Sequence, residues 1–421
     1  MPDRTTTPTP PSTPPATGGP AAPVVPAWAD VDLDAVAANA ALLRERAQGA
    51  ALMAVVKAEG YGHGAVPAAL AALAGGATWL GVAHLDEALA LRAAGITAPV
   101  LAWVLVPGQD TTAAVEAGVD VSASAPWAVD ALAAAARRTG RTARVHLKVD
   151  TGLSRGGATA REWPDLVRTA AAAQAEGAVE VVGVWSHLAS ADDPAADALT
   201  HRQADRLDEA LAVAAGLGVR PPLRHLANSA GVLAHPRTRL DLVRAGIAVY
   251  GVTPSPVRGS AADLGLVPAM ALRARLSLVK EVGPGEGVSY GHQHVTAART
   301  RLALVPLGYG DGVPRHASGR GPVLVGGRRH PVAGRVCMDQ VVLDLGDDEA
   351  ARAVRAGDVV ELFGTGADGG PTAQDWADAA GTIGYEVVTR LGARVPRRYT
   401  GAVARRHGLD VAGPAAAQVL P

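Results

Sequence analysis

A lysine followed by a glycine-rich turn is the part of this sequence that most clearly suggests chemistry. Lys57 ends a short apolar run that is typical of a buried strand, and residues 58–64 then supply three glycines, one tyrosine and one histidine. Desolvation at the end of a buried strand lowers the pKa of a lysine toward the neutral amine. A neutral amine forms a Schiff base with an aldehyde cofactor, and glycines let the backbone approach a ligand closely.

The composition narrows the choice of a reactive lysine. The chain has 39 Lys and Arg residues, but only Lys57, Lys148 and Lys280 are lysines. A solvated surface charge is the ordinary alternative for a lysine at a strand end. Any covalent use of a lysine therefore has three candidates.

Alternating strand and helix patterns must position these groups. Strand-like runs cover residues 54–57, 79–82, 100–103, 119–121, 145–149, 181–185, 223–226 and 242–244. Helical spacing covers residues 33–46, 86–94, 128–139, 162–176 and 201–215, with Asp32 or Asp34 as a first cap and Gly95, Gly140, Gly177 and Gly216 at C-caps. Eight such units predict the α/β class and a (β/α)8 TIM-type barrel. A doubly wound sheet is the alternative, but the glycine spacing after residue 57 differs from its dinucleotide fingerprint.

A smaller, mainly β C-terminal domain is expected after the barrel. Strand-like runs cover residues 272–281, 302–306, 323–325, 340–345 and 359–362, and helical patterns appear only at 376–381 and 385–391. Residues 1–27 are rich in Pro, Thr and Ala and predict a disordered tail. The predicted domains are therefore the tail at 1–27, the barrel at 28–267 and the β-rich domain at 268–421.

Charge and cysteine content exclude several classes of protein. The net charge of −1 gives no electrostatic footprint for nucleic acid or an anionic membrane. No apolar run reaches the roughly 18–20 residues of a membrane helix, and the start lacks a secretory core. The single cysteine, Cys337, suits a reducing compartment, so a cytoplasmic protein is expected. His292 and His294 have no cysteine or acidic cluster beside them, and the sequence predicts no metal site.

Polar groups recur where the predicted barrel strands end. They are Lys57, residues 148–155, residues 185–187, residues 225–229 and residues 244–247. A barrel collects function at the C-terminal ends of its strands, and the loops after the seventh and eighth strands are a favoured phosphate site. Taken alone, Asn228 could be a helix cap and His187 a buried core histidine. Five groups at matching strand ends indicate an active site.

At these residues the sequence resembles a known family. The segment Val-Lys-Ala-Glu-Gly-Tyr-Gly-His-Gly at 56–64 is similar to the pyridoxal-phosphate lysine motif of alanine racemases, which are fold-type III pyridoxal-phosphate enzymes. The resemblance extends from about residue 28 to 399. Its motifs lie at residues 148–155, 184–189, 227–230, 243–251, 288–291, 308–312, 336–340 and 385–397. It implies a (β/α)8 barrel followed by a β domain, and a head-to-tail homodimer whose active sites use both chains.

The resemblance implies a two-base mechanism. Lys57 resembles the lysine that holds pyridoxal 5'-phosphate and acts on one face of the substrate, and Tyr290 resembles the opposite base, supplied by the partner subunit. Racemisation needs a proton removed from one face of Cα and returned to the other. Arg244 resembles the donor to the pyridine nitrogen, and His187 resembles a link between Tyr290 and Arg244. An arginine keeps its proton, so the ring is a weak electron sink, which favours clean proton return.

The remaining site residues also follow from the resemblance. It implies phosphate contacts from Tyr61, Asn228, Ser229, Gly246, Ile247 and Tyr385, substrate carboxylate contacts from Arg155 and the N–H of Met338, a carbamylated Lys148, and an entrance formed by Tyr309, Asp311, Arg315 and Asp339. The sequence departs from the usual pattern at three positions. Glu59 replaces a more frequent Asp, and Leu153-Ser154 replaces Met-Gly before Arg155.

The expected function is racemisation of L- and D-alanine, which supplies D-alanine for peptidoglycan. A broad-specificity amino-acid racemase is the nearest alternative, because pocket volume is not readable from sequence. A decarboxylase of the same fold would use an acidic partner for the ring nitrogen, and Arg244 argues against it. A metal-dependent aldolase would need a divalent-metal site, which the sequence does not predict. A non-catalytic pyridoxal-phosphate carrier would lack the second domain.

Overall fold

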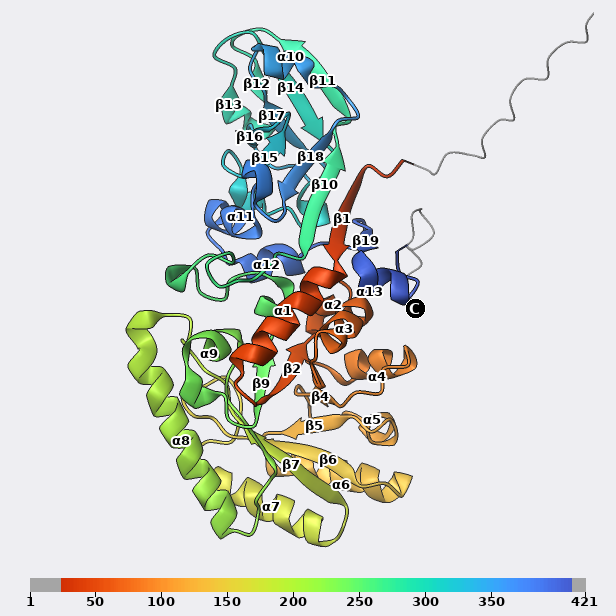
Figure 1. The fold of residues 1–421 in the computed structure, drawn as a ribbon, viewed down its shortest axis with the longest axis vertical. Coiled ribbons are helices and arrows are strands. Elements are labelled where there is room, and N and C mark those ends of the chain that lie inside the picture. Colours follow the sequence, from red (N-terminus) through yellow and green to blue (C-terminus); the bar gives the residue numbers. More distant parts are fainter. Residues whose placement is uncertain (1–23, 411–421) are drawn as a thin grey trace, which may run out of the picture.

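A barrel of eight parallel strands forms the first part of the computed structural model, which describes residues 24–410 (Figure 1). The strands are β2 (Ala51–Val55), β3 (Trp79–Val82), β4 (Val100–Ala102), β5 (Asp120–Ala123), β6 (Ala143–Lys148), β7 (Val179–Trp185), β8 (Leu223–His225) and β9 (Leu242–Ala245). Their order is β8-β7-β6-β5-β4-β3-β2-β9. The seam between β8 and β9 has two backbone hydrogen bonds, from Asp241 to Arg224 (3.1 Å) and from Arg244 to Ala227 (2.9 Å). The barrel predicted from the sequence is confirmed.

Helices cover the outside of the barrel. They are α1 (Leu33–Arg46), α3 (Ala65–Ala74), α4 (Leu85–Ala93), α5 (Thr112–Glu116), α6 (Pro126–Thr139), α7 (Trp163–Ala175), α8 (Asp197–Gly216) and α9 (Ser229–Ala234). Asp32 caps α1 by accepting from the N–H groups of Asp34 and Ala35. Helix α1 has the predicted bounds.

Three of the four predicted glycine caps are confirmed. Gly140 caps α6 with a left-handed φ of 67°, and Gly95 and Gly177 have φ of 82° and 74° just beyond their helices. The prediction for Gly216 was wrong, because α8 continues through this residue and its C-cap is Leu217. Gly218, with φ of 87°, supplies the left-handed turn there.

The core has two layers because the strands are buried on both faces. Alanine, valine and leucine fill the space between strands and helices. A smaller apolar cluster of Met53, Trp79, Leu101, Val182 and Leu242 lies apart from that layer. All five of these side chains come from barrel strands, as expected for the packed interior of a barrel.

Three antiparallel or mixed sheets build the C-terminal part. Their strands are β10 (Met270–Arg275), β11 (Leu278–Val282), β12 (Gly287–Val288), β13 (His294–Val295), β14 (Thr300–Val305), β15 (Pro322–Val325), β16 (Arg328–Pro331), β17 (Val341–Asp344), β18 (Val359–Phe363) and β19 (Arg397–Thr400). The helices are α10 (Glu349–Ala353), α11 (Ala373–Ala380), α12 (Gly384–Thr389) and α13 (Gly401–Arg406). The predicted, mainly β C-terminal part is confirmed.

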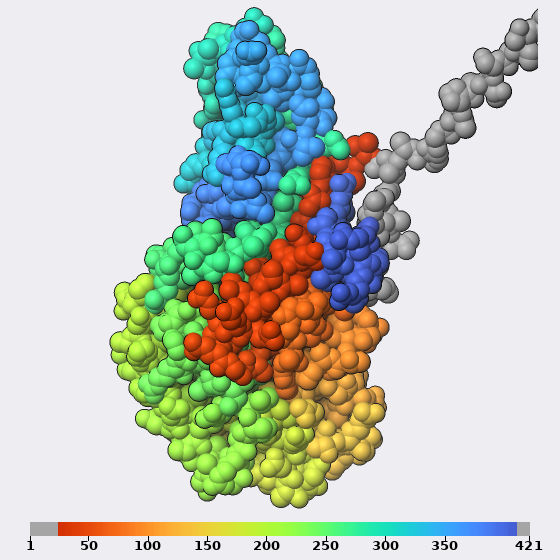
Figure 2. Space-filling view, viewed as in Figure 1, coloured from red at the N-terminus to blue at the C-terminus, as the bar shows by residue number. Residues whose placement is uncertain are grey.

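The first strand belongs to the C-terminal part rather than to the barrel. β1 (Ala27–Asp32) lies between β10 and β19 in the six-stranded sheet β16-β15-β18-β10-β1-β19. It pairs antiparallel with β10 and parallel with β19. Figure 2 shows the C-terminal part as a narrower lobe above the barrel, with the N-terminal segment between them. The domain boundaries at 27/28 and 267/268 stay predictions, and residues 1–23 of the predicted tail lie outside the described residues.

Across residues 24–410, none of the helices has both the length and the apolar composition needed to span a bilayer.

Candidate active site

The turn after Lys57 is left-handed. The sequence predicted that Lys57 ends a strand, but β2 ends at Val55 and Lys57 begins the short helical segment α2 (Lys57–Tyr61). Ala58, Glu59 and Gly60 have φ between 51° and 59° and ψ between 45° and 55°. Such a turn costs roughly 1–2 kcal/mol for each residue that is not glycine, so other contacts must hold it.

Glu87 on α4 provides one of these contacts. Its carboxylate accepts from the backbone N–H of Ala58 (2.6 Å) and from those of Ala83 (2.8 Å) and His84 (3.0 Å). Charge-assisted hydrogen bonds of this kind are stronger than neutral ones. Glu87 therefore ties the lysine turn to the loop that follows β3.

Lys57 itself is half-buried at the mouth of the barrel. Its Nζ lies 5.7 Å from the ring centroid of Trp103, which follows β4. Burial lowers the pKa of Lys57, the Arg155 guanidinium lowers it further, and Glu87 opposes both. This direction agrees with the sequence expectation of an amine that is readily neutral.

Arg244 is buried in β9, with 4% of its surface exposed. Its guanidinium donates to the carbonyls of Ser186 (2.7 Å) and Leu226 (3.1 Å), and it contacts Nδ1 of His225 (3.1 Å) and Nδ1 of His187 (3.3 Å). Burial lowers the pKa of Arg244 to about 9. The side chain is therefore cationic at neutral pH and held by four groups that carry no charge.

The two histidines beside Arg244 are neutral at neutral pH. Burial lowers the pKa of His187 and of His225 well below the usual value, and the positive charge of Arg244 is the second cause for both. Each ring can then accept a hydrogen bond from Arg244 through Nδ1. The sequence-predicted pair His187 and Arg244 is brought together.

A pocket of hydroxyls and backbone N–H groups surrounds the start of the loop after β9. A Cβ added to Gly246 would lie 2.4 Å from the Tyr61 hydroxyl, so only glycine leaves room for this contact. Ser229 Oγ accepts from the N–H of Gly246 (2.9 Å), and the rings of Tyr61 and Tyr385 lie 6.4 Å apart. Burial raises the pKa of both tyrosines, so both hydroxyls stay protonated donors.

Asn228 and Ile247 flank this pocket. Asn228 is the N-cap of α9, where its side chain accepts from the N–H of Gly231 (3.0 Å). Ile247 begins the 3-10 helix η3 (Ile247–Tyr250) directly after Gly246. The helix-cap role considered for Asn228 is thus the one that its contacts give, and its contact with a cofactor stays a prediction.

Lys148 lies at the end of β6, and Arg155 lies on the loop that follows it. Lys148 ends β6, and its Nζ lies 4.4 Å from the Trp185 ring centroid. Burial, then Arg244 and Arg155, lower the pKa of Lys148 to about 8. Asp150 holds the loop by accepting from three successive N–H groups, those of Gly152, Leu153 and Ser154. The side chain of Arg155 is exposed.

Ser154 shows why glycine is usual at its position. Its φ is 56°, in the left-handed region that glycine adopts without strain. The neighbouring residue Gly152, with φ of 126°, is also at positive φ. Serine in place of glycine therefore puts left-handed backbone strain directly before Arg155.

Of the predicted site residues in the C-terminal part, Tyr385 lies beside Tyr61, whereas Tyr290 and Met338 face solvent. Tyr290 and Met338 are 71% and 54% exposed. Figure 1 shows β12 and β13, which flank Tyr290, in the upper part of the C-terminal lobe, whereas α2 lies beside the barrel. Arg394 donates to Asp311 (2.9 Å) and Asp339 (2.8 Å), so two of the predicted entrance residues share one arginine.

Tyr309 and Arg315, the other two predicted entrance residues, begin the 3-10 helices η6 (Tyr309–Asp311) and η7 (Arg315–Ala317). Both lie on the same stretch of chain as Asp311, and Tyr309 is 39% exposed. Within residues 24–410, no group of three or more His, Cys, Asp or Glu side chains could hold a metal ion.

Both parts of the chain match alanine racemases. The model of the alanine racemase N-terminal domain matches residues 31–254, and that of the C-terminal domain matches residues 269–399. Alanine racemase of Frankia casuarinae is 56% identical over 382 residues, which cover 91% of this chain and 98% of that protein. The chain belongs to the alanine racemase family. Its members are isomerases that depend on pyridoxal phosphate, so the enzyme class and cofactor predicted from the sequence are confirmed.

Solved alanine racemases have the same fold. The crystal structure of alanine racemase from the D-cycloserine-producing Streptomyces lavendulae has a TM-score of 0.89 and 54% identity, over 91% of this chain and all of that one. The alanine racemase of Bacillus anthracis, solved with bound L-Ala-P, has a TM-score of 0.81 and 36% identity, over 91% of this chain and 97% of that one.

The residues at the barrel mouth fit the cofactor of this family. A half-buried lysine with a lowered pKa suits the aldehyde, and the hydroxyls around Gly246 suit the phosphate. The buried cation of Arg244 suits a hydrogen bond to a neutral ring nitrogen.

Sequence reasoning gave no role to two tryptophans of this alanine racemase family member. Trp103 lies beside Lys57, and Trp185 has Arg244 on its ring at 4.6 Å and Lys148 at 4.4 Å. Cations over an aromatic face are stabilised by its quadrupole. Both tryptophans stand at strand ends, like the residues that were identified, and that position was the available signal.

Proposed function

We propose that this protein interconverts L-alanine and D-alanine, with pyridoxal phosphate held by Lys57. The observation that carries the proposal is the 56% identity to the alanine racemase of Frankia casuarinae over 91% of the chain, together with the buried Arg244 on β9. When bound, pyridoxal phosphate withdraws electrons from the substrate Cα and makes its proton removable. The product D-alanine would supply peptidoglycan synthesis.

Lys57 takes and returns a proton on one face of the substrate. Its lowered pKa leaves a larger fraction of free amine at neutral pH than an exposed lysine has. The left-handed turn, tied by Glu87, fixes where the side chain begins. The Lys57 amine is therefore more readily neutral than that of an exposed lysine, and its side chain starts from a fixed backbone position.

Arg244 donates a hydrogen bond to the ring nitrogen and keeps its proton. Four uncharged partners hold the guanidinium in one orientation. Because Arg244 would keep its proton rather than transfer it to the nitrogen, the bound cofactor would supply only weak electron withdrawal at the substrate Cα. This favours proton return over transamination.

We assign the binding roles as the sequence predicts them. Tyr61, Tyr385, Ser229, Gly246, Ile247 and Asn228 hold the phosphate, and Arg155 with the N–H of Met338 holds the substrate carboxylate. Lys148, with its pKa lowered to about 8, reacts with carbon dioxide as a neutral amine and releases a proton. The resulting carbamate orients Arg155, and Tyr309, Asp311, Arg315 and Asp339 line the entrance.

Tyr290 supplies the second base from a second copy of the chain. Its side chain is 71% exposed, and the flanking strands β12 and β13 lie in the upper part of the lobe, away from α2 (Figure 1). A two-fold dimer presents the same two surfaces twice and completes two sites. His187 then links Tyr290 to Arg244. A cytoplasmic location stays a prediction from the sequence.

Circular dichroism tests the reaction directly. The purified, cofactor-loaded protein is incubated with L-alanine and, separately, with D-alanine. Decay of both signals to zero is expected. A stable signal from folded, loaded protein would reject alanine as the substrate, and serine, lysine and arginine would then test the broad-specificity alternative.

Complementation tests the shared site. Lys57→Ala and Tyr290→Phe are each expected to be inactive as pure variants. When equal amounts of the two variants are mixed and allowed to re-associate, half of the dimers are heterodimers. Each heterodimer has one intact site and one site that lacks both bases, so about one quarter of wild-type activity should return. No recovery from a mixture shown to contain heterodimers would place both bases in one chain.

A further inference from the structure

A chain of buried polar side chains runs from Arg244 through the interior of the barrel. His225 Nε2 lies 2.9 Å from His146 Nδ1, and His146 Nε2 lies 3.1 Å from Asp120 Oδ2. His225, His146 and Asp120 are each at most 1% exposed. With the 3.1 Å contact between Arg244 and His225, the four side chains form one continuous path.

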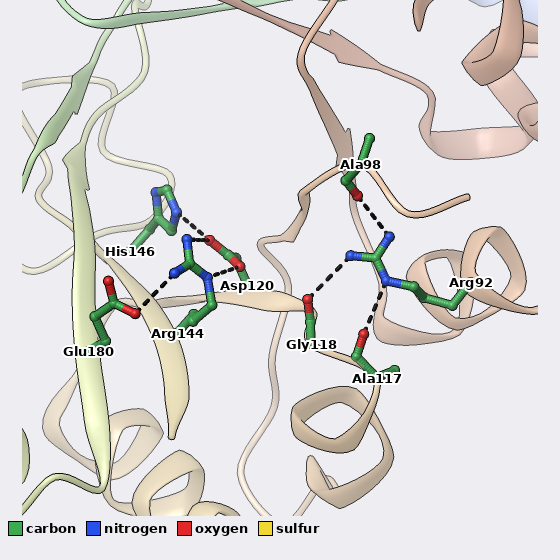
Figure 3. Close-up of polar contacts among 8 residues, drawn as sticks. All are labelled: Arg92, Ala98, Ala117, Gly118, Asp120, Arg144, His146 and Glu180. Carbon is green, nitrogen blue, oxygen red and sulfur yellow. Dashed lines mark hydrogen bonds and ion pairs between the residues drawn. The ribbon is translucent and has the colours of Figure 1, made fainter. Parts of the chain in front are cut away.

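The path spans the barrel from one end to the other. Arg244 and His225 lie near the C-terminal ends of β9 and β8, His146 lies within β6, and Asp120 is the first residue of β5. Figure 3 shows the far end, where His146 and Arg144 both point at Asp120 and Glu180 lies beyond Arg144. The Arg144 side chain is 37% exposed, so the path reaches solvent on the side opposite the active site.

The two ends fix the direction of every hydrogen bond. An arginine can only donate and an ionised carboxylate can only accept. His225 must therefore accept at Nδ1 and donate from Nε2, and His146 must accept at Nδ1 and donate from Nε2 to Asp120. Only one tautomer of each histidine satisfies all three contacts.

The surrounding residues are shaped to allow this path. A Cβ added to Gly183 on β7 would lie 2.5 Å from His146 Nδ1 and 3.2 Å from His225 Nε2, so the glycine makes room for the contact between the rings. Trp185 stacks on His225 with centroids 5.6 Å apart, and Trp79 meets His146 edge-on at 5.6 Å. Both imidazoles are thus held in position by aromatic neighbours.

Asp120 is itself fixed at the far end. Arg144 donates to its Oδ1 from Nε at 2.8 Å. Arg92 on α4 donates to the carbonyls of Ala117 (3.0 Å) and Gly118 (3.2 Å), directly before β5 (Figure 3). Oδ1 of Asp120 therefore accepts the shorter bond from Arg144, whereas Oδ2 accepts from His146 at 3.1 Å and, at 3.4 Å, from Nη2 of Arg144.

We propose that Asp120, His146 and His225 are positioning residues that hold Arg244 in the orientation needed at the cofactor ring. The carboxylate sets the tautomer of His146, which sets that of His225, which leaves Nδ1 of His225 as the acceptor that fixes Arg244. The inference rests on the proposed function only in placing Arg244 at the ring nitrogen. A carboxylate at the far side of the barrel thereby tunes the electron-withdrawing strength of the site.

The tautomers in the wild-type protein give the first test. Full-length, cofactor-loaded protein labelled with 15N-histidine is studied by solid-state NMR, and coupling across the hydrogen bond identifies the paired rings. One pair is expected, with each ring protonated at Nε2 and accepting at Nδ1. Absence of a coupled pair, or a ring of the pair protonated at Nδ1, would overturn the proposal whether or not the protein racemises alanine.

The Asp120→Asn variant gives the second test. If the amide oxygen stays with Arg144, the NH2 group faces His146 and donates to its Nε2. Both histidines must then carry their proton on Nδ1. The Nδ1–H of His225 would face the N–H of Arg244, and that hydrogen bond would be lost. The expected results are a changed 15N shift of ring-labelled pyridoxal phosphate and a fall in kcat of about tenfold or more with little change in KM, as for other outer-shell partners. Glu180→Gln, which alters only the exposed end, is the matched control and should leave both unchanged.

An unchanged ring-nitrogen shift in folded, loaded Asp120→Asn protein would overturn the proposal. If this variant does not fold, the wild-type tautomers decide alone. Failure of the wild type to racemise alanine would instead contradict the proposed function, so the two failures are distinguishable.

Discussion

The barrel mouth and the C-terminal lobe contribute site residues of opposite character. In the barrel, Arg244 is 4% exposed and has four partners, and the turn that carries Lys57 is tied down by Glu87. In the lobe, Tyr290 and Met338 are more than half exposed. The barrel residues of the site are held in place by contacts within a single chain, whereas Tyr290 and Met338 of the lobe face solvent.

This difference indicates where each half acquires its order. Buried groups have their desolvation and orientation set by folding, as the pKa shifts of Lys57 and Arg244 show. The exposed Tyr290 is neither desolvated nor oriented by contacts within its own chain. We therefore expect substitutions in the barrel to change chemistry and cofactor binding, and those in the lobe to act through association.

The largest effect is expected at Lys57. The Lys57→Ala variant should lose the covalently held cofactor and at least on the order of 10⁴-fold in kcat/KM, because the cofactor attachment and one base are removed together. Absorbance of the bound cofactor and racemisation of alanine measure the two losses. Lys280→Ala, at an exposed position on β11, should leave both unchanged. Retained activity in Lys57→Ala would contradict the assigned base.

Tyr290→Phe should reduce racemisation by about 10²–10⁴-fold, the usual contribution of a general acid or base. The cofactor spectrum should be unchanged, because Lys57 and the phosphate pocket are intact. Circular dichroism, followed over time from L-alanine and separately from D-alanine, measures the rate in each direction. A Tyr290→Phe enzyme with wild-type rates would show that the lobe contributes no base and would remove the contrast between the two regions.

Acid should destabilise the barrel turn before the lobe. His63 is buried, and burial lowers its pKa from 6.5 to about 4, although two backbone carbonyls favour its protonated form. The unfolded chain then binds more protons, so the stability from His63 is fully present above pH 6.5 and is lost as the pH falls toward 4. The loss is at most about 3 kcal/mol.

Urea unfolding at several pH values between 7.5 and 4.5 measures this loss. His63→Asn keeps a donor near the two carbonyls and does not titrate, so its stability should fall less steeply with acid. Equal slopes for the wild type and His63→Asn would assign the acid sensitivity to other groups.

Ser154→Gly should give the smallest effect. The serine is exposed with φ of 56°, so glycine removes left-handed strain but adds freedom to the unfolded chain. The expected net gain is about 0.5–1 kcal/mol in the free energy of unfolding, with little change in kcat. Thermal unfolding detects the gain, and Ser154→Ala should show none. A loss of stability in Ser154→Gly would mean that the loop is not strained.

Much of the barrel was predictable because its signals are local. Each strand is a short apolar run and each long helix has regular spacing, so α1 has the predicted bounds and all eight barrel strands are present. The site residues at strand ends followed from the same pattern. The left-handed turn after Lys57 was not predictable, since it depends on Glu87, which is distant in sequence.

Contacts between distant segments escaped the sequence reasoning. The pattern of apolar and polar residues in β1 would suit any strand. The neighbouring sequence does not indicate that β1 pairs with β10 and β19. His146 and Asp120 are single polar residues in apolar strands, and only the closed barrel brings them to His225. Register across a sheet is a property of the whole chain.

The position of β1 has a consequence for the order in which the protein is made. Val31 pairs with Tyr399, so the first strand to leave the ribosome waits for one of the last. At synthesis rates of about 5–20 residues per second, the interval is roughly 20–70 s. During this time the barrel can assemble while β1 has an unpaired edge, and a nascent chain of this protein depends on β19, or on a chaperone, to keep that edge from pairing elsewhere.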